Sequence, residues 1–510
     1  MSSVAVAPSP AVAPSPAVAL SPAGAPARPD RRGLLLYGLL GFSAGLPFHM
    51  FSTVLALRLQ GAGVALAVIG FFAWVQLLPT LKFVWAPLLD RYAVPGFGRW
   101  WGLRRGWIML SQLGIAGALA AMAWTGGTDL PLLALFALLL AFWTTTLEVA
   151  ADAWRIELYP SQDEQGPVVA ANLWGYRSAM VAAGGGALIL ADWGGWTLAY
   201  LAVAAVAFLP FPLLAAMRPV DGATGGRARA LAAGLLAGAG VLLATALVAA
   251  AIGYALLRLA AAAGIGADAN VTPWVLALCM APFLLMAAML PRLRRAPADS
   301  VLRRSAALGP YVDFFRRYGF AALLLMAFVS LYRMGDVLAL NLSKPMIKGL
   351  GYGLSQIGRA DGMVALAASV AGVGLGGWMV TRRPMMATLA VGAVVAAVGN
   401  LGFVWLAHQA VSEPLLYVAT GLDQFGNGFA GAVFVVYLSL LVNPRHPGAQ
   451  YAFLTGFAFL LPRLLAGAGG TIVGAIGYDG FFLLSGALSL AALPFLPALA
   501  RVRPRGEEPA

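Results

Sequence analysis

The feature that most constrains this chain is a series of fourteen long apolar runs separated by short polar loops. The runs cover approximately residues 33 to 57, 66 to 89, 106 to 124, 131 to 157, 167 to 190, 195 to 217, 230 to 257, 272 to 290, 319 to 342, 355 to 380, 384 to 407, 414 to 442, 449 to 475 and 480 to 500. Nearly all exceed the roughly 20 residues that a helix needs to cross a bilayer core. Because 61% of the residues are hydrophobic and only 10% are charged, we predict an all-α, polytopic membrane protein with about 14 transmembrane helices.

The distribution of arginine predicts the orientation of these helices. Alternate numbering of the loops places nearly all loop arginines on one side, and only Arg58, Arg258, Lys344 and Lys348 fall on the other. By the positive-inside rule both termini are cytoplasmic, and an odd number of helices would scramble the pattern. The net charge of +13 is spread over many short loops, so we expect no nucleic-acid binding.

Cysteine and histidine usage predicts neither a disulfide framework nor a metal site. The single cysteine, Cys279, lies inside an apolar run, which is typical of a small buried hydrophobic residue. The three histidines are scattered and have no metal-ligand spacing. We therefore expect no metal and no cofactor.

Corresponding residues in the two ends of the chain indicate a duplicated unit. The fourth runs of the two blocks carry Glu148 and Asp423, and the fifth runs carry Arg177 and Arg463. Repeated halves around a site near the midplane are typical of transporters. We predict six-helix halves at residues 33 to 217 and 319 to 500, an inserted two-helix segment with a basic cytoplasmic linker at residues 218 to 318, and cytoplasmic tails at residues 1 to 32 and 501 to 510.

Three of these segments have distinctive compositions. Residues 5 to 22 repeat Ala-Val-Ala-Pro-Ser-Pro twice and then read Ala-Val-Ala-Leu-Ser-Pro, which predicts that residues 1 to 32 form a disordered tail. No basic segment precedes the repeat, as one would in a cleaved signal peptide. The uncharged run at 230 to 257 favours a structural role for the insert. In the linker, the apolar residues Val301, Leu302, Leu308, Phe314 and Phe315 alternate with arginines, so it either lies on the inner leaflet or is a plain connection.

Ionisable residues within membrane helices cost roughly 2.5 to 3.5 kcal/mol each near the centre, so they are functional candidates. Glu148 and Asp152 are four residues apart on one helical face, and Arg155 follows three residues later. Two such carboxylates repel each other, so one can take up and release a proton during transport. The alternative is a structural ion network in which Arg155 or Lys82 neutralises the pair.

Three further arginines belong to this set of candidates. Arg333 and Asp336 stand at i and i+3, so they either pair with each other or contact a ligand beside Gly335. Arg177 and Arg463 have no acid at helical spacing, so each needs a partner on another helix or on an anionic ligand. We predict proton coupling by Glu148, Asp152, Asp336 or Asp423, and substrate binding by Lys82, Arg155, Arg177, Arg333 and Arg463.

The end of the second run predicts a gate. Asp90, Arg91 and Arg99 lie where this helix meets the cytoplasm, and Asp90 can cap the positive end of a facing helix and be released when the halves rock apart. Arg104 and Arg105 are accounted for by topology alone.

These residues resemble motifs of the major facilitator superfamily, and more closely those of the AmpG-type muropeptide permeases. The matching segments are residues 41 to 47 (Gly-Phe-Ser-Ala-Gly-Leu-Pro), 82 to 92, 104 to 107, 152 to 155, 175 to 177 and 331 to 336. One departure is Leu147 before Glu148, where members of that family often carry glutamine before aspartate. The resemblance implies a fold of two six-helix halves with two inserted helices, and proton-driven import of anhydromuropeptides across a bacterial inner membrane for wall recycling.

Other functions remain open at this stage. A similar transporter could import another solute, such as a siderophore or a peptide. A membrane-embedded enzyme lacks support because no intramembrane histidine lies beside an acid, and a sensor would normally carry a soluble signalling domain. We expect a monomer whose partners are a sugar-peptide substrate, protons and lipid.

Overall fold

A computed structural model describes residues 29–51, 53–64, 73–94, 97–127, 129–216, 291–292, 295, 305, 308–467, 469–502 and 504. Within these residues all regular structure is helical. A bilayer core offers no water to backbone groups, so a spanning segment must satisfy its own hydrogen bonds, as a helix does. The predicted runs at 230 to 257 and 272 to 290, the tail before residue 29 and Cys279 lie outside the described part.

The first block of helices occupies residues 31 to 216 and is named the first bundle. Its elements are α1 (Arg31–Met50), α2 (Thr53–Gly61), η1 (Ala73–Val84), α4 (Ala86–Arg91), α5 (Phe97–Trp124), α6 (Leu130–Leu158), α7 (Gln162–Val181), η2 (Ala182–Gly186), α8 (Ala187–Ala207) and α9 (Pro210–Ala216). Its core contains the buried side chains of Leu40, Met50 and Leu140.

The second bundle occupies residues 309 to 499. Its elements are α13 (Gly309–Tyr318), α14 (Ala321–Tyr332), α15 (Met334–Gly349), α16 (Leu354–Arg359), η4 (Ala360–Val364), α17 (Ala365–Arg382), α18 (Met385–Ala407), α19 (Glu413–Leu441), α20 (Pro447–Gly467), α21 (Gly469–Leu490), η5 (Leu493–Phe495) and α22 (Leu496–Leu499). Its core contains Phe328, Phe434 and Phe457.

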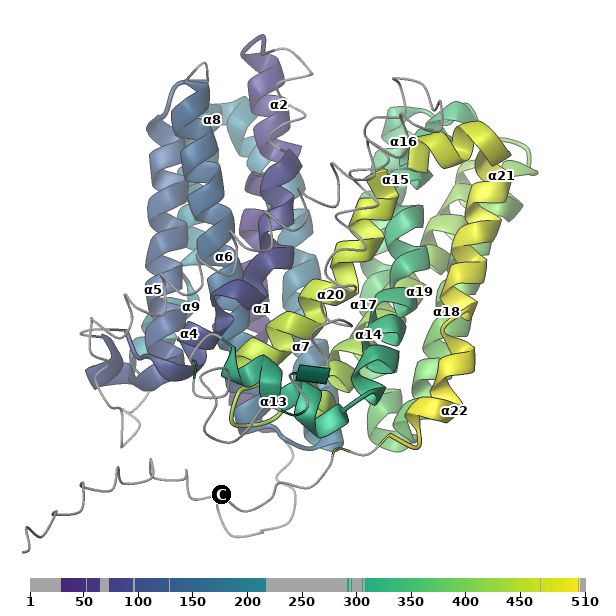
Figure 1. Ribbon diagram of the computed structural model, residues 1–510. Coiled ribbons are helices and arrows are strands. Elements are labelled where there is room, and N and C mark those ends of the chain that lie inside the picture. Colours follow the sequence, from purple (N-terminus) through teal and green to yellow (C-terminus); the bar gives the residue numbers. More distant parts are fainter. Residues whose placement is uncertain are drawn as a thin grey trace, which may run out of the picture.

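The two bundles stand side by side, with α7 and α20 between them (Figure 1). Two residues of α20, Ala449 and Ala452, belong to the core of the first bundle. In return, Ile156 of α6 and Val169 of α7 belong to the core of the second. These contacts lie at the end where α4 meets α20 and α7 meets α17, which we name the closed end.

A helix interruption at a glycine occurs late in the sequence of each bundle, as expected of a duplicated unit. Gly195 in α8 has φ 80°, and Gly477 in α21 has φ 71°. A side chain at either position would be strained in this left-handed conformation, which glycine adopts at no cost. Each break redirects the chain into the last helix of its bundle. The predicted domain boundaries themselves stay predictions.

Nine helical segments of the described residues are long and apolar enough to cross a membrane. One of them, Gln162–Ala216, covers two predicted runs, those at 167 to 190 and 195 to 217. The all-helical, membrane-spanning class is therefore confirmed, whereas the count of fourteen stays a prediction.

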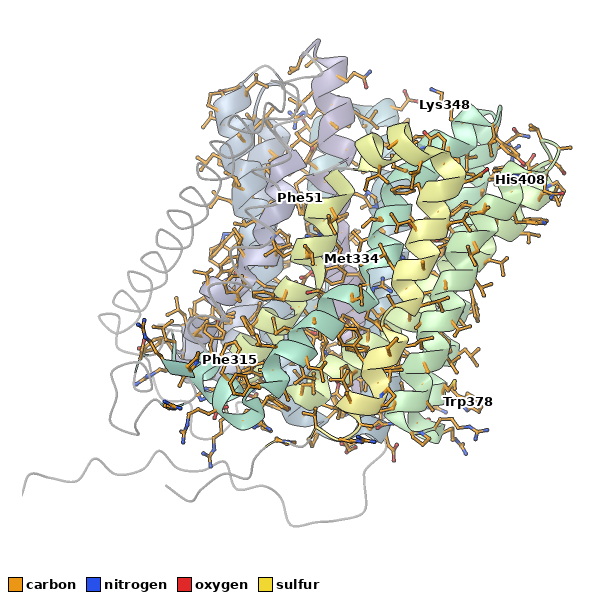
Figure 2. All side chains as sticks on the ribbon, turned by 45° about the vertical axis from the view of Figure 1, so that its right-hand side comes forward. Phe51, Phe315, Met334, Lys348, Trp378 and His408 are labelled. Carbon is orange, nitrogen blue, oxygen red and sulfur yellow. The ribbon has the colours of Figure 1, made fainter. Side chains whose placement is uncertain are left out.

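Helix α13 corrects one interpretation of the basic linker. Phe314 and Phe315 are 0% and 2% exposed and pack against the ring of Phe453 in α20. Figure 2 shows Phe315 at the lower end of the molecule, among the helices. The prediction that these two residues could lie on the inner leaflet is wrong, because the protein itself covers them. Val301 and Leu302 lie outside the described residues.

Candidate functional site

The polar residues predicted within the membrane lie mainly where the bundles face each other. On α6, the carboxylates of Glu148 and Asp152 each have a cationic neighbour. The Nζ atom of Lys82 is 3.7 Å from Oε2 of Glu148, and Nη2 of Arg155 donates to Oδ1 of Asp152 at 2.9 Å. The cationic partners neutralise both acids in this conformation, so the carboxylate pair is part of an ion network.

Arg155 also joins α6 to the second bundle. Its Nη1 atom donates to Oε1 of Gln165 at 2.5 Å and to the hydroxyl of Ser439 at 3.2 Å, and its guanidinium lies 5.5 Å from the ring centre of Tyr451. The residue is 1% exposed. Arg155 is therefore enclosed by protein in this conformation, and substrate contact by this residue stays a prediction.

A second cluster is centred on Asn427 of α19. The side-chain oxygen Oδ1 of Asn427 accepts hydrogen bonds from Nη2 of Arg177 at 2.8 Å and from Nη2 of Arg333 at 3.1 Å. Arg333 also donates to Oδ2 of Asp336 at 2.7 Å. Arg177 comes from the first bundle and Arg333 from the second, so one neutral amide holds two guanidinium groups across the interface.

Sequence reasoning missed Asn427. The residue stands four positions after Asp423 in α19, so both lie on the same helical face. A polar side chain at that spacing from an intramembrane acid was the signal that could have found it. The carboxyl of Asp423 accepts from the amide of its neighbour Gln424 at 2.8 Å, and its electrostatic neighbours include Asp336 and Arg177.

Asp423 also borders a small cavity of about 20 Å³ in the second bundle, lined in part by Lys344 and Asp361. The Nζ atom of Lys344 is 2.6 Å from Oδ2 of Asp361. A cavity of this size holds one water molecule. Asp423 therefore lies beside a water-sized cavity that it shares with the ion pair of Lys344 and Asp361.

The two arginines of the fifth helices have unlike surroundings. Arg177 donates to an amide on another helix, as described above. Arg463 of α20 lies 5.6 Å from the ring centre of Phe459, and its electrostatic neighbours are Tyr176 and Glu148. Arg463 thus lies nearer the α6 ion network, and Arg177 belongs to the Asn427 cluster.

Asp90 forms the contact expected of a gate. Its Oδ1 accepts from the backbone N–H of Gly448 at 2.9 Å, and Oδ2 accepts from that of Ala449 at 2.7 Å. These N–H groups belong to the first turn of α20, where the helix dipole favours a negative charge. Burial lowers the pKa of His446, so this neighbouring imidazole is neutral at pH 7 and adds no charge. Asp90 thus links α4 of the first bundle to α20 of the second.

Arg104 supports Asp90 from within the first bundle. Its Nη1 atom donates to Oδ1 of Asp90 at 2.8 Å, and its Nη2 atom donates to Oε1 of Glu157 at 2.7 Å. The side chain is buried. The interpretation of Arg104 as a topology-setting charge alone is therefore wrong. Arg91 is exposed beside the ring of Tyr92, and the side chain of Arg99 is outside the described part.

Two further contacts seal the closed end. A Cβ atom on Gly166 of α7 would stand 2.6 Å from the carbonyl oxygen of Gly377 in α17, so only glycine allows this approach. The hydroxyl of Tyr311 in α13 donates to the carbonyl oxygen of Phe83 in η1. Burial raises the pKa of Tyr311 well above its ordinary value, so this donor stays protonated.

Among the described residues, no group of three or more His, Cys, Asp or Glu side chains could hold a metal.

Comparisons with known proteins agree with this architecture. The fucose:proton symporter of Escherichia coli superposes with a TM-score of 0.56 at 12% identity, covering 92% of this chain and 99% of the symporter. The chain has the major facilitator fold. Over 476 residues it is 26% identical to the anhydromuropeptide permease of E. coli K12, and this alignment covers 91% of this chain and 79% of the permease.

A second relative, a transporter named AmpG 4 of Rickettsia conorii, is 26% identical over 459 residues, or 89% of this chain and 93% of the relative. No protein-family profile matches the chain. The AmpG-type resemblance predicted from short motifs is confirmed and extends along most of the sequence.

Proposed function

We propose that this chain is a secondary transporter that imports anhydromuropeptides across the bacterial inner membrane by proton symport. The observation that carries the proposal is the similarity to the anhydromuropeptide permease over 91% of the chain. The curated relatives are named as permeases or transporters, so the proposed activity is transport and not catalysis.

The Asn427 cluster suits an anionic part of such a substrate. Arg177 and Arg333 share one neutral amide oxygen, although each guanidinium can make several hydrogen bonds. A carboxylate can pair with arginine through two parallel hydrogen bonds and supplies the negative charge that a neutral amide oxygen lacks. The stem peptide of a muropeptide carries carboxylates, so a stem carboxylate would replace or join Asn427 between these two arginines.

The α6 ion network supports proton coupling. Glu148 lies 3.7 Å from Lys82, has Arg463 among its electrostatic neighbours and is 26% exposed through its side chain. A proton on Glu148 would remove its attraction to both cations, whereas Asp152 remains held by Arg155. We propose Glu148 as the coupling acid, with Asp152, Asp336 and Asp423 as further candidates.

The contacts of Asp90 support alternating access. With both termini in the cytoplasm, the closed end faces the cytoplasm. Release of Asp90 from Gly448 and Ala449 would then accompany opening of the cytoplasmic gate. Arg91 and Arg99 flank this contact in the sequence and complete the proposed gate.

Uptake of labelled anhydromuropeptide into membrane vesicles, with and without a proton gradient, tests the function. Arg177→Gln should weaken binding of the peptide-bearing sugar about tenfold more than binding of the peptide-free disaccharide, because only the former brings carboxylates. Arg359→Gln is the matched control, since Arg359 pairs with Glu413 on an exposed surface. Gradient-independent uptake by the wild type would contradict proton symport, and equal losses for both ligands would contradict the carboxylate site.

A further inference from the structure

A groove between the two bundles plays no part in the proposed transport route. Its volume is about 670 Å³, and α1, α7 and α17 form its walls. Leu35, Trp174 and Trp378 line it and are 61%, 42% and 57% exposed. Figure 2 shows Trp378 at the outer edge of the helices, near the lower end of the molecule. These three side chains leave a large apolar surface uncovered by protein.

The depth of this groove follows from close helix packing. A Cβ atom on Gly175 of α7 would stand 1.9 Å from the carbonyl oxygen of Gly38 in α1, so the two backbones touch and form a floor without side chains. Trp174 reaches across to α17, where its indole N–H donates to the carbonyl oxygen of Val370 at 2.9 Å. All three helices lie in segments long and apolar enough to span a membrane. The solvent for this groove is therefore lipid.

One end of the groove carries positive charge. Arg31 precedes Leu35 by four residues in α1, and Arg382 follows Trp378 by four residues in α17. Residues four apart lie on one face of a helix. Helices α1 and α7 run parallel, since Gly41 and Gly45 meet Asn172 and Tyr176 in order, and α17 runs opposite to α7, since Gly377 meets Gly166 and Gly374 meets Trp174. The start of α1 and the end of α17 therefore lie at the same end of the groove, and so do both arginines. Both are exposed, as are their neighbours Arg32 and Arg383.

Acidic groups near this end are fewer. Asp163 is exposed and precedes the groove residue Pro167 by four positions in α7. The carboxylate of Asp30 already accepts from the backbone N–H of Gly33 at 2.8 Å, and Glu164 is bonded to Ser161. The four arginines outnumber these three carboxylates, so the mouth of the groove has a small excess of positive charge. Tryptophan and arginine together are typical of the level of lipid headgroups.

We propose that this groove binds an anionic glycerophospholipid, with an acyl chain between α1, α7 and α17 and the phosphate at Arg31 and Arg382. Such a lipid contacts both bundles beside the Gly166 and Gly377 contact. It therefore stabilises the closed end. The inference concerns the lipid-facing side of the molecule and does not depend on which solute is transported.

Native mass spectrometry of the full-length protein in detergent tests the headgroup contact, with phosphatidylglycerol as the probe and phosphatidylcholine as the comparison. In the wild type phosphatidylglycerol should bind more tightly. The double variant Arg31→Gln/Arg382→Gln should lose about tenfold in affinity for phosphatidylglycerol and little for phosphatidylcholine. The control Arg295→Gln/Arg501→Gln removes the same charge from exposed positions outside the groove and should bind as the wild type.

Equal affinity of the wild type for the two lipids, or an equal loss in the control, would overturn the headgroup assignment.

A second variant tests the position of the acyl chain. Ser178 is exposed and lines the groove, so Ser178→Phe fills part of its volume without changing any arginine. Retention of both lipids should fall several-fold, and phosphatidylglycerol should no longer raise the melting temperature. If a folded Ser178→Phe protein retained both lipids as well as the wild type does, the lipid acyl chain would lie elsewhere.

Discussion

Replacement of Asp90 by asparagine should shift the protein away from the conformation described here. Asp90 accepts two backbone N–H bonds from Gly448 and Ala449, at 2.9 and 2.7 Å, and its side chain is 3% exposed. Asparagine keeps one acceptor oxygen but loses the charge that interacts with the first turn of α20. Hydrogen bonds to charged groups contribute roughly 1.5 to 3 kcal/mol, and a neutral bond about 1.

Two such charged bonds reduced to one neutral bond lose at least about 2 kcal/mol across the interface, which changes the ratio of closed to open conformers roughly 30-fold or more. Spin labels at Leu158→Cys in the first bundle and Pro444→Cys in the second, in a background without Cys279, would report the separation at the closed end. Both positions are exposed. The Asp90→Asn protein should show a larger population of long distances.

Glu157→Gln is the matched control for this experiment. Glu157 pairs with Arg104 at 2.7 Å, and both residues belong to the first bundle. Its neutralisation weakens the support of Asp90 without removing the contact with α20, so the distance distribution should stay close to that of the wild type. Unchanged distances in Asp90→Asn, or equal shifts in both variants, would refute the gate argument.

Three further predictions concern coupling, substrate charge and topology. Glu148→Gln should abolish gradient-driven accumulation in vesicles while exchange stays measurable, because the amide mimics a permanently protonated acid; full accumulation would move the coupling role to another carboxylate. Asn427→Asp should place a fixed negative charge between Arg177 and Arg333, where it competes with a substrate carboxylate, so affinity for the peptide-bearing sugar should fall about tenfold in a binding titration. Unchanged affinity would place the carboxylate site elsewhere. Reporter fusions after Arg229 and after Arg304 should both report cytoplasm, and a periplasmic signal at either would contradict the fourteen-helix topology.

Local periodicity was sufficient for the features that lie within one helix. Apolar runs longer than a bilayer core predicted the membrane helices, since backbone polarity leaves a spanning segment no alternative. A spacing of three residues likewise offered the pairing of Arg333 with Asp336 and of Arg155 with Asp152 as one alternative for each, and the structure contains both pairs.

The partners across the interface depended on tertiary structure. Asp90 and Gly448 are 358 positions apart, and Arg177 and Asn427 are 250 apart. The sequence indicated that Asp90 could cap a helix and that Arg177 needed a partner, but neither spacing nor charge identified α20 or Asn427. Such contacts depend on which helix faces pack together, and a single sequence without contacts between helices does not specify that packing.

The same distinction explains the aromatic residues of the linker. Phe314 and Phe315 belong to an amphipathic helix whose apolar face suits either lipid or protein, so sequence alone left both possibilities. The ring of Phe453 in α20 covers them, because α13 folds back under the second bundle. The chain therefore determined that a face must be buried, and only the fold decided what buries it.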